Sequence, residues 1–268
     1  MFTSPWIAAL VAIFSWWFFT GIILLVVRSA DRQGTAAHRM SVVFGVPFLA
    51  LGVFGLVISA ASFTTANIYA AFLSVLLIWG WIELAFLSGV ITGPERRPCP
   101  ENLQGWARFV RAWHTLSHHE LLLLCGLLVV TVATTGAENT TGFWAYLILF
   151  GARISAKLNL FFGVPRINTE FVPKPLHHLK SYFRQGNITF AFVIGVSLLS
   201  LASVMFGERL ISSDAGPTKA SYALLFALAA LATIEHWLMV IPLPDAKLWR
   251  WMLPALPTTP KTGQSHEL

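Results

Sequence analysis

Seven long apolar stretches, separated by short polar connections, dominate the hydrophobic pattern of the chain. At about 1.5 Å rise per residue, helices of this length cross a hydrocarbon layer about 30 Å thick, although the fifth only just does so. The pattern predicts an all-α fold: one transmembrane domain of seven helices over residues 1–241 and a tail over 242–268. The predicted spans are 5–27, 41–63, 67–91, 112–135, 141–158, 188–206 and 218–241.

The basic residues predict how this bundle is oriented. Sixteen of the 18 lysines and arginines fall in alternate connections or at the span edges beside them. The positive-inside rule assigns that side to the cytoplasm. The first apolar run is too long for a cleavable signal peptide, and Arg28 and Arg32 follow it rather than precede it. We therefore expect a periplasmic N-terminus, a cytoplasmic C-terminus, and contact between the basic side and anionic lipid headgroups.

Composition excludes several classes of protein. Hydrophobic residues make up 56% of the chain and charged residues 11%, against about 25% charged in a typical soluble domain. A water-soluble fold and a disordered chain are both excluded. The net charge of +6 comes with no nucleic-acid-binding motif, so we expect no nucleic-acid partner. Cys99 and Cys125 form no disulfide framework or CxxC site.

The longest connection, residues 159–187, carries an amphipathic segment over 174–184. Leu176, Leu179 and Phe183 recur at helical spacing, and Lys180 and Arg184 occupy other faces. This pattern predicts a helix at the membrane interface. The stretch 102–113 and the residues after 245 have a similar character.

Polar residues inside the spans form a predicted layer near the cytoplasmic side. An ionisable group in hydrocarbon costs from about 2.5 kcal/mol upward, so each needs a partner or a function. At about 1.5 Å per residue from the cytoplasmic ends of the spans, the acids and imidazoles of this layer lie about 8 to 12 Å below the inner membrane boundary. The third, fourth and seventh spans supply them, and Arg153 and Lys157 of the fifth approach the same depth. The members of the layer are Glu83, His118, His119, Glu120, Glu235 and His236.

Three interpretations of this layer remain open from the sequence. In the first, Arg153, Lys157 and the imidazoles neutralise the glutamates. In the second, a histidine is the axial ligand of a tetrapyrrole. In the third, the layer is a metal or catalytic centre, since histidines four residues apart share a helix face and a carboxylate can complete the ligand set. The metal candidates are Glu83, His114, His118, Glu120 and Glu235, which match neither HExxH nor a repeated ExxH motif.

Four blocks of the sequence resemble a known family. They are FSWWFFTGIILLVVR (14–28), WHTLSHHELLLL (113–124), KLNLFFGVPRINTEFVPKPLHHLKSYF (157–183) and EHWLMVIPLPDAKLW (235–249). These blocks are similar to the photosynthetic complex assembly protein 2 family, called PuhE, of purple phototrophic bacteria. The third block is the most specific because it is long and polar. The resemblance implies a multi-pass protein of the bacterial inner (intracytoplasmic) membrane that assists assembly of the reaction centre and the light-harvesting complex and affects bacteriochlorophyll supply.

The resemblance carries over no catalytic residue, so we expect an assembly factor rather than an enzyme. Bacteriochlorophyll magnesium accepts one neutral imidazole, and a pigment-handling protein places that imidazole where lipid can reach it. His118 is the first candidate and His236 the second, and His114 and His119 complete the set. The alternative is a membrane-embedded His/Glu metalloenzyme acting on a pigment precursor or a lipid.

The resemblance also suggests a docking surface on the cytoplasmic side. Its expected partners are reaction-centre and light-harvesting subunits or pigment-biosynthesis proteins. The candidate residues for this surface, and for contact with membrane lipid, are Asn159, Arg166, Lys174, Lys180 and Arg184.

Overall fold

Seven α-helices long and apolar enough to span a membrane make up most of the structure. The computed structural model describes residues 2–242, and this part contains no β-strand, so the all-α prediction is confirmed. The segment after 245, for which an interfacial helix is predicted, lies outside the described residues. In chain order the helices are α1 (Pro5–Gln33), α2 (Thr35–Ala60), α3 (Thr65–Leu87), α4 (Gly105–Thr134), α5 (Thr141–Phe162), α6 (Phe190–Ser212) and α7 (Pro217–Leu238).

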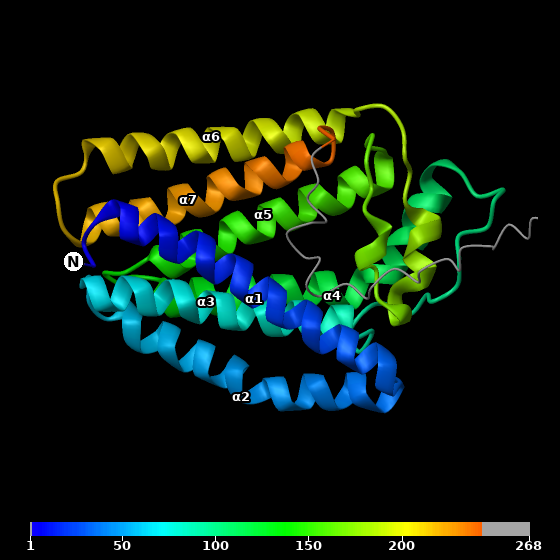
Figure 1. Cartoon of the computed structure of the whole chain (residues 1–268), viewed down its shortest axis with the longest axis horizontal. Coiled ribbons are helices and arrows are strands. Elements are labelled where there is room, and N and C mark those ends of the chain that lie inside the picture. The colour runs from blue at the N-terminus through cyan, green and yellow to red at the C-terminus, as the bar shows by residue number, and fades with distance from the viewer. Residues whose placement is uncertain (1, 243–268) are drawn as a thin grey trace, which may run out of the picture.

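Successive helices run in alternating directions, so the connections gather at two ends (Figure 1). One end holds the N-terminal residues and the short turns before α3, α5 and α7. The other end holds the α1–α2 turn at Gly34, the two long connections and the end of α7. Among the described residues, every lysine and arginine except Arg209 and Lys219 lies in the half of the bundle nearest this second end. We call it the basic end, and the first the opposite end.

Helix α3 lies at the centre of the bundle. It packs against α1, α2, α4, α5 and α7, whereas α2 and α6 lie at opposite edges (Figure 1). Its sequence is apolar on all sides, which is the pattern of a buried helix, and Phe72, Val75 and Ile82 are almost fully buried. A charged residue on α3, such as Glu83, is therefore surrounded by protein rather than by lipid.

The predicted helix ends are wrong in three places that affect the site. Helix α4 begins at Gly105 because the amphipathic stretch before the fourth span is continuous with it. Helix α3 ends at Leu87, and the residues after it form an irregular connection. Helix α5 continues to Phe162, beyond the predicted end at 158, and this places Asn159 inside a helix.

The amphipathic segment of the long connection is a 3-10 helix, η2 (Lys174–Tyr182), which follows a shorter one, η1 (Thr169–Phe171). A 3-10 helix repeats every three residues, and Leu176, Leu179 and Tyr182 are its buried residues. Leu176 and Leu179 pack against Phe86 at the end of α3. The predicted segment is helical, and its apolar side covers the protein's own basic end. We call η2 the cap.

The opposite end is closed by a fully buried asparagine. The Nδ2 atom of Asn139 donates to the carbonyl oxygens of Ser59 and Asn67, each at 3.0 Å. Its Oδ1 atom accepts from the backbone N–H of Thr141 at 3.1 Å. Asn139 thus ties the connection before α5 to the end of α2 and the first turn of α3. Its side-chain amide uses all its hydrogen-bonding capacity there except one lone pair.

Candidate functional site

Two ion pairs link α3, α4 and α5 in the basic half of the bundle. Nη2 of Arg153 on α5 donates to Oε2 of Glu83 on α3 at 2.7 Å. Lys157, one turn further along α5, pairs with Glu120 on α4. The side chains of Lys157 and Glu120 are 13% and 5% exposed. Two acids and two bases therefore cancel, as the first interpretation of the layer predicts for these residues.

His119 is the imidazole that joins this layer. Its side chain is 0% exposed, and its ring stacks on Phe86 with centroids 4.2 Å apart. Its Nε2 atom lies 3.8 Å from Oε1 of Glu83, which is too far for a hydrogen bond. Neither ring nitrogen of His119 has a hydrogen-bond partner. The structure thus brings together Glu83, His119, Glu120, Arg153 and Lys157.

His114 and His118 lie elsewhere. Both are exposed on the outer face of α4, which also presents Leu121 and Leu128. Consecutive residues on an α-helix differ by about 100°, so His118 points outward where His119 points inward. The shared layer of Glu83, His118 and Glu235 is therefore a wrong prediction. The side chain of His118 faces the surroundings of the bundle rather than its interior.

His236 on α7 is buried, and both of its ring nitrogens are hydrogen-bonded. Nδ1 lies 2.8 Å from the carbonyl oxygen of Ala232, which must accept, so Nδ1 carries the proton. Nε2 then accepts from the hydroxyl of Ser155 on α5 at 2.9 Å. Gly195 on α6 leaves room for this contact, because a Cβ atom there would collide with the Ser155 hydroxyl. His236 therefore acts as a link between α5 and α7.

Glu235, the neighbour of His236, borders the layer without a direct contact, because its carboxylate interacts electrostatically with Arg153. It is half-buried on α7 and makes no hydrogen bond or ion pair with the residues that the structure describes. Over the same residues, 2–242, no three His, Cys, Asp or Glu side chains are grouped so that they could hold a metal ion.

The connection between α3 and α4 packs against the middle of α4. The backbone N–H of His119 donates to the carbonyl oxygen of Thr92 at 3.0 Å, and that of Glu95 donates to the carbonyl oxygen of His114 at 3.1 Å. A Cβ atom on Gly93 would overlap the α4 backbone at His114, so only glycine allows this approach. Irregular backbone at membrane depth is tolerated where protein buries it.

Arg108 and Arg111 hold the cap in place. The sequence indicates them only as basic residues. Arg108 donates to the carbonyl oxygen of Tyr182 at 2.6 Å, and Nε of Arg111 donates to the Tyr182 hydroxyl at 3.2 Å. Arg111 also pairs with Glu95 at 2.9 Å. The backbone N–H of Arg97 and the Arg111 guanidinium hold the pKa of Glu95 below its usual range. Burial raises the pKa of Tyr182.

The residues of the predicted docking surface differ in their exposure. Asn159 is 0% exposed, so it is no part of any surface; the helix that places it inside continues past the predicted end of the span. Arg166 is half-buried and donates to the carbonyl oxygen of Ile241 at 2.6 Å. Lys174 donates to the carbonyl oxygen of Asp31 at 3.0 Å. Lys180 and Arg184 are exposed at the basic end.

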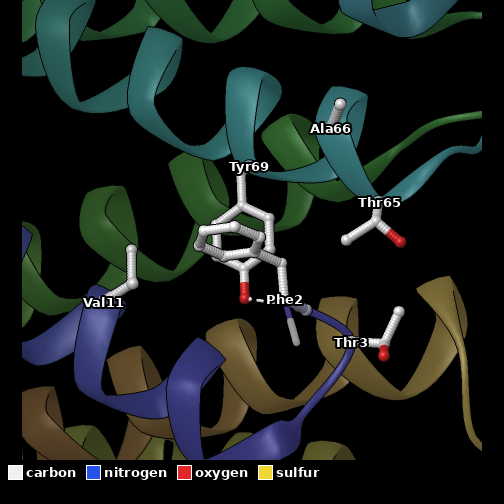
Figure 2. A pocket seen from close by; sticks show the side chains of 6 residues that line it. All are labelled: Phe2, Thr3, Val11, Thr65, Ala66 and Tyr69. Carbon is white, nitrogen blue, oxygen red and sulfur yellow. Dashed lines mark hydrogen bonds between the residues drawn. The ribbon is translucent and has the colours of Figure 1, made fainter.

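One pocket lies far from these groups, at the opposite end. It has a volume of about 520 Å³ between the N-terminal residues, α1 and α3 (Figure 2). The Tyr69 hydroxyl donates to the carbonyl oxygen of Phe2 at 2.9 Å beside it. Its lining offers no titratable group except Tyr69, so it has no part in the chemistry of the layer. The lining residues are Phe2, Thr3, Val11, Thr65, Ala66 and Tyr69.

Comparison with known proteins places the chain in a family. Residues 2–259 match the model of DUF3623, described as "Protein of unknown function (DUF3623)". The chain belongs to the DUF3623 family. A relative from Rhodobacter capsulatus is 47% identical over 253 residues, which cover 94% of this chain and 92% of the relative.

The relative is described as "Uncharacterized 30.4 kDa protein in puhA 5'region". The gene of this relative therefore lies in the 5' region of puhA, which agrees with the gene context that the resemblance implies. No solved structure matches the chain significantly.

Proposed function

We propose that this DUF3623 protein is a membrane assembly factor for the photosynthetic reaction centre and light-harvesting complex, and that His118 offers an axial ligand to bacteriochlorophyll. The position of the relative's gene beside puhA supports the photosynthetic context. The observation that carries the ligand role is the exposure of His118 on the outer face of α4, next in sequence to a residue of the ion-pair layer.

An imidazole at this position is costly unless a ligand uses it. A polar group facing lipid at this depth loses water without gaining a protein partner. Among the described residues, the side chains of His114 and His118 take part in no hydrogen bond or ion pair, so their ring nitrogens are available. The apolar residues along the same face, Leu121 and Leu128, suit the tail and macrocycle of a pigment dissolved in the membrane.

The other candidate histidines are less suitable for this role. His236 would have to give up its Ser155 hydrogen bond, and His119 lies beneath Phe86 with no exposed surface. The outer face of α4 is therefore where we place pigment contact.

The basic end is the proposed contact surface for partner subunits, pigment-biosynthesis proteins and anionic headgroups. Lys180 and Arg184 are exposed there, and hydrogen bonds of Arg108 and Arg111 hold the cap that carries Lys180. On the orientation that the positive-inside rule gives, this surface is cytoplasmic.

Deleting the gene in its phototrophic host and restoring it in variant form tests the proposal. Deletion lowers the membrane absorbance of the reaction centre and antenna, and the unchanged gene restores it. His118→Leu fails to restore it, because leucine suits a lipid-facing position but cannot ligate magnesium. Cys125→Ala, an exposed position on the same helix face, restores it fully. Unchanged absorbance on deletion would contradict the assembly role, and full restoration by His118→Leu would contradict the ligand role.

A further inference from the structure

Three buried polar atoms without partners meet at the Glu83–Arg153 ion pair. They are Oε1 of Glu83, Nε2 of His119 and Nε of Arg153. The pair is joined through Oε2 and Nη2 only, so one atom on each side of it is left unused. Buried polar groups are nearly always hydrogen-bonded, to protein or to ordered water, because leaving one unpaired costs about 1–3 kcal/mol.

The geometry at this point suits one bridging molecule. Oε1 of Glu83 and Nε2 of His119 are 3.8 Å apart. A single atom can lie about 2.8 Å from both, at ordinary hydrogen-bond length. A buried water typically makes about three hydrogen bonds. Arg153 contacts the same carboxylate through Nη2 at 2.7 Å, and its Nε is buried and without a partner, so it is the candidate for the third bond.

Charge selects a neutral occupant. Glu83 and Glu120 are each paired directly with a base, Arg153 and Lys157, and Glu235 interacts with Arg153 without a direct contact. A cation would meet the two bases, and an anion would meet the two carboxylates. A water molecule can donate to the carboxylate oxygen and to an unprotonated imidazole nitrogen, and it can accept from the guanidinium.

The surrounding structure encloses this position. Phe86 covers one face of the His119 ring, and Leu176 and Leu179 of the cap pack on Phe86. The connection at Thr92 binds the backbone of His119 itself. An occupant here is therefore part of the folded structure rather than bulk solvent.

We propose that Glu83, His119 and Arg153 together bind one internal water molecule at membrane depth. This water site is independent of the pigment role of His118. A carboxylate, an imidazole and a water in contact are the groups that a buried proton acceptor needs.

A density map that resolves ordered water, from the full chain in a lipid nanodisc, tests this directly. The expected result is a peak at about 2.7–3.2 Å from both Oε1 of Glu83 and Nε2 of His119. A direct Glu83–His119 hydrogen bond with no such peak would overturn the proposal.

The sign of a melting-temperature change gives an independent test. If the site is hydrated, His119→Phe removes one hydrogen-bond partner of the buried water, so the melting temperature falls by about 3 °C or more. If the site is dry, the same change removes an unpaired imidazole and keeps the stack on Phe86, so the melting temperature rises. Cys125→Phe, at an exposed position of the same helix, is the control and leaves the melting temperature unchanged. A rise with His119→Phe contradicts the water site.

Discussion

Two asparagines at the two ends of the bundle are equally buried and entirely different in their surroundings. Asn139 and Asn159 are both 0% exposed. The amide of Asn139 makes three hydrogen bonds at the opposite end. The amide of Asn159 makes none in the basic half, where Oδ1 and Nδ2 are both unpartnered.

The same difference extends to the residues around them. Near the opposite end, Thr141 and Ser221 also hydrogen-bond to each other, at 2.8 Å. The basic half contains the unpartnered atoms of His119 and Glu83. Saturated polar groups hold helices together, whereas unsatisfied ones mark positions that something else completes. The polar groups of Asn139 and Thr141 at the opposite end are thus hydrogen-bonded within the protein, and the basic half is where we place the water site.

Breaking a balanced pair in the basic half has the largest expected effect. Lys157→Met leaves the buried Glu120 carboxylate without its base, which costs about 3–5 kcal/mol of unfolding free energy. Chemical denaturation in mixed micelles measures it. The double variant Glu120→Leu/Lys157→Met recovers most of the loss, because neither charge is then left unpaired. A single-variant loss below about 1 kcal/mol would show that the pair is solvated.

Removing the hydrogen-bonded amide of Asn139 is expected to cause the second-largest loss of unfolding free energy. Asn139→Leu leaves two carbonyl oxygens and one N–H without partners, and we expect a loss of about 2–3 kcal/mol in the same denaturation experiment. An unchanged unfolding free energy would mean that water replaces this amide, and the contrast between the two ends would fail.

The matched change in the basic half is expected to be small. Asn159→Leu removes an amide that forms no hydrogen bond, so the unfolding free energy changes by less than about 1 kcal/mol or rises. A loss as large as that of Asn139→Leu would show that Asn159 has a structural partner.

The smallest expected effect comes from weakening the ion pair between Glu95 and Arg111, the arginine that hydrogen-bonds to the cap. The pKa of Glu95 is lowered in the folded protein. The ionised Glu95 carboxylate therefore stabilises the fold fully above its ordinary pKa of 4.5, and this stabilisation is lost as the pH falls through the lowered value. Glu95→Gln mimics the protonated state at pH 7. We expect faster maleimide labelling of Cys99, whose backbone N–H donates to Ser181 on the cap.

The control for this experiment is Glu138→Gln, an exposed carboxylate at the opposite end. It leaves the labelling rate of Cys99 unchanged. Equal labelling rates in Glu95→Gln and the unchanged protein would show that Glu95 does not hold the cap.

Hydropathy predicts the seven spans well, because a membrane demands about twenty apolar residues whatever the helix packs against. The rotation of α4 could not be predicted from depth alone, and it decides that His119 rather than His118 faces Glu83. A signal was present: Thr115 and Gly126 share the inner face with His119, and small residues favour helix contact.

Two other errors have equally local causes. The predicted end of the fifth span at 158 left Asn159 in a connection, although apolar residues continue to Phe162. The spacing of Leu176, Leu179 and Tyr182 is three throughout, which indicates a 3-10 helix rather than an α-helix. No sequence pattern indicates that the connection at Gly93 binds the backbone of α4, since that contact depends on the packing of the cap.

The absorption spectrum of the gently purified protein tests the central claim most directly. Protein taken from phototrophic membranes is predicted to show a bound bacteriochlorophyll band, which His118→Leu abolishes and Cys125→Ala retains. A pigment-free spectrum of the unchanged protein, or a band that survives His118→Leu, would contradict the assignment of His118 as the ligand.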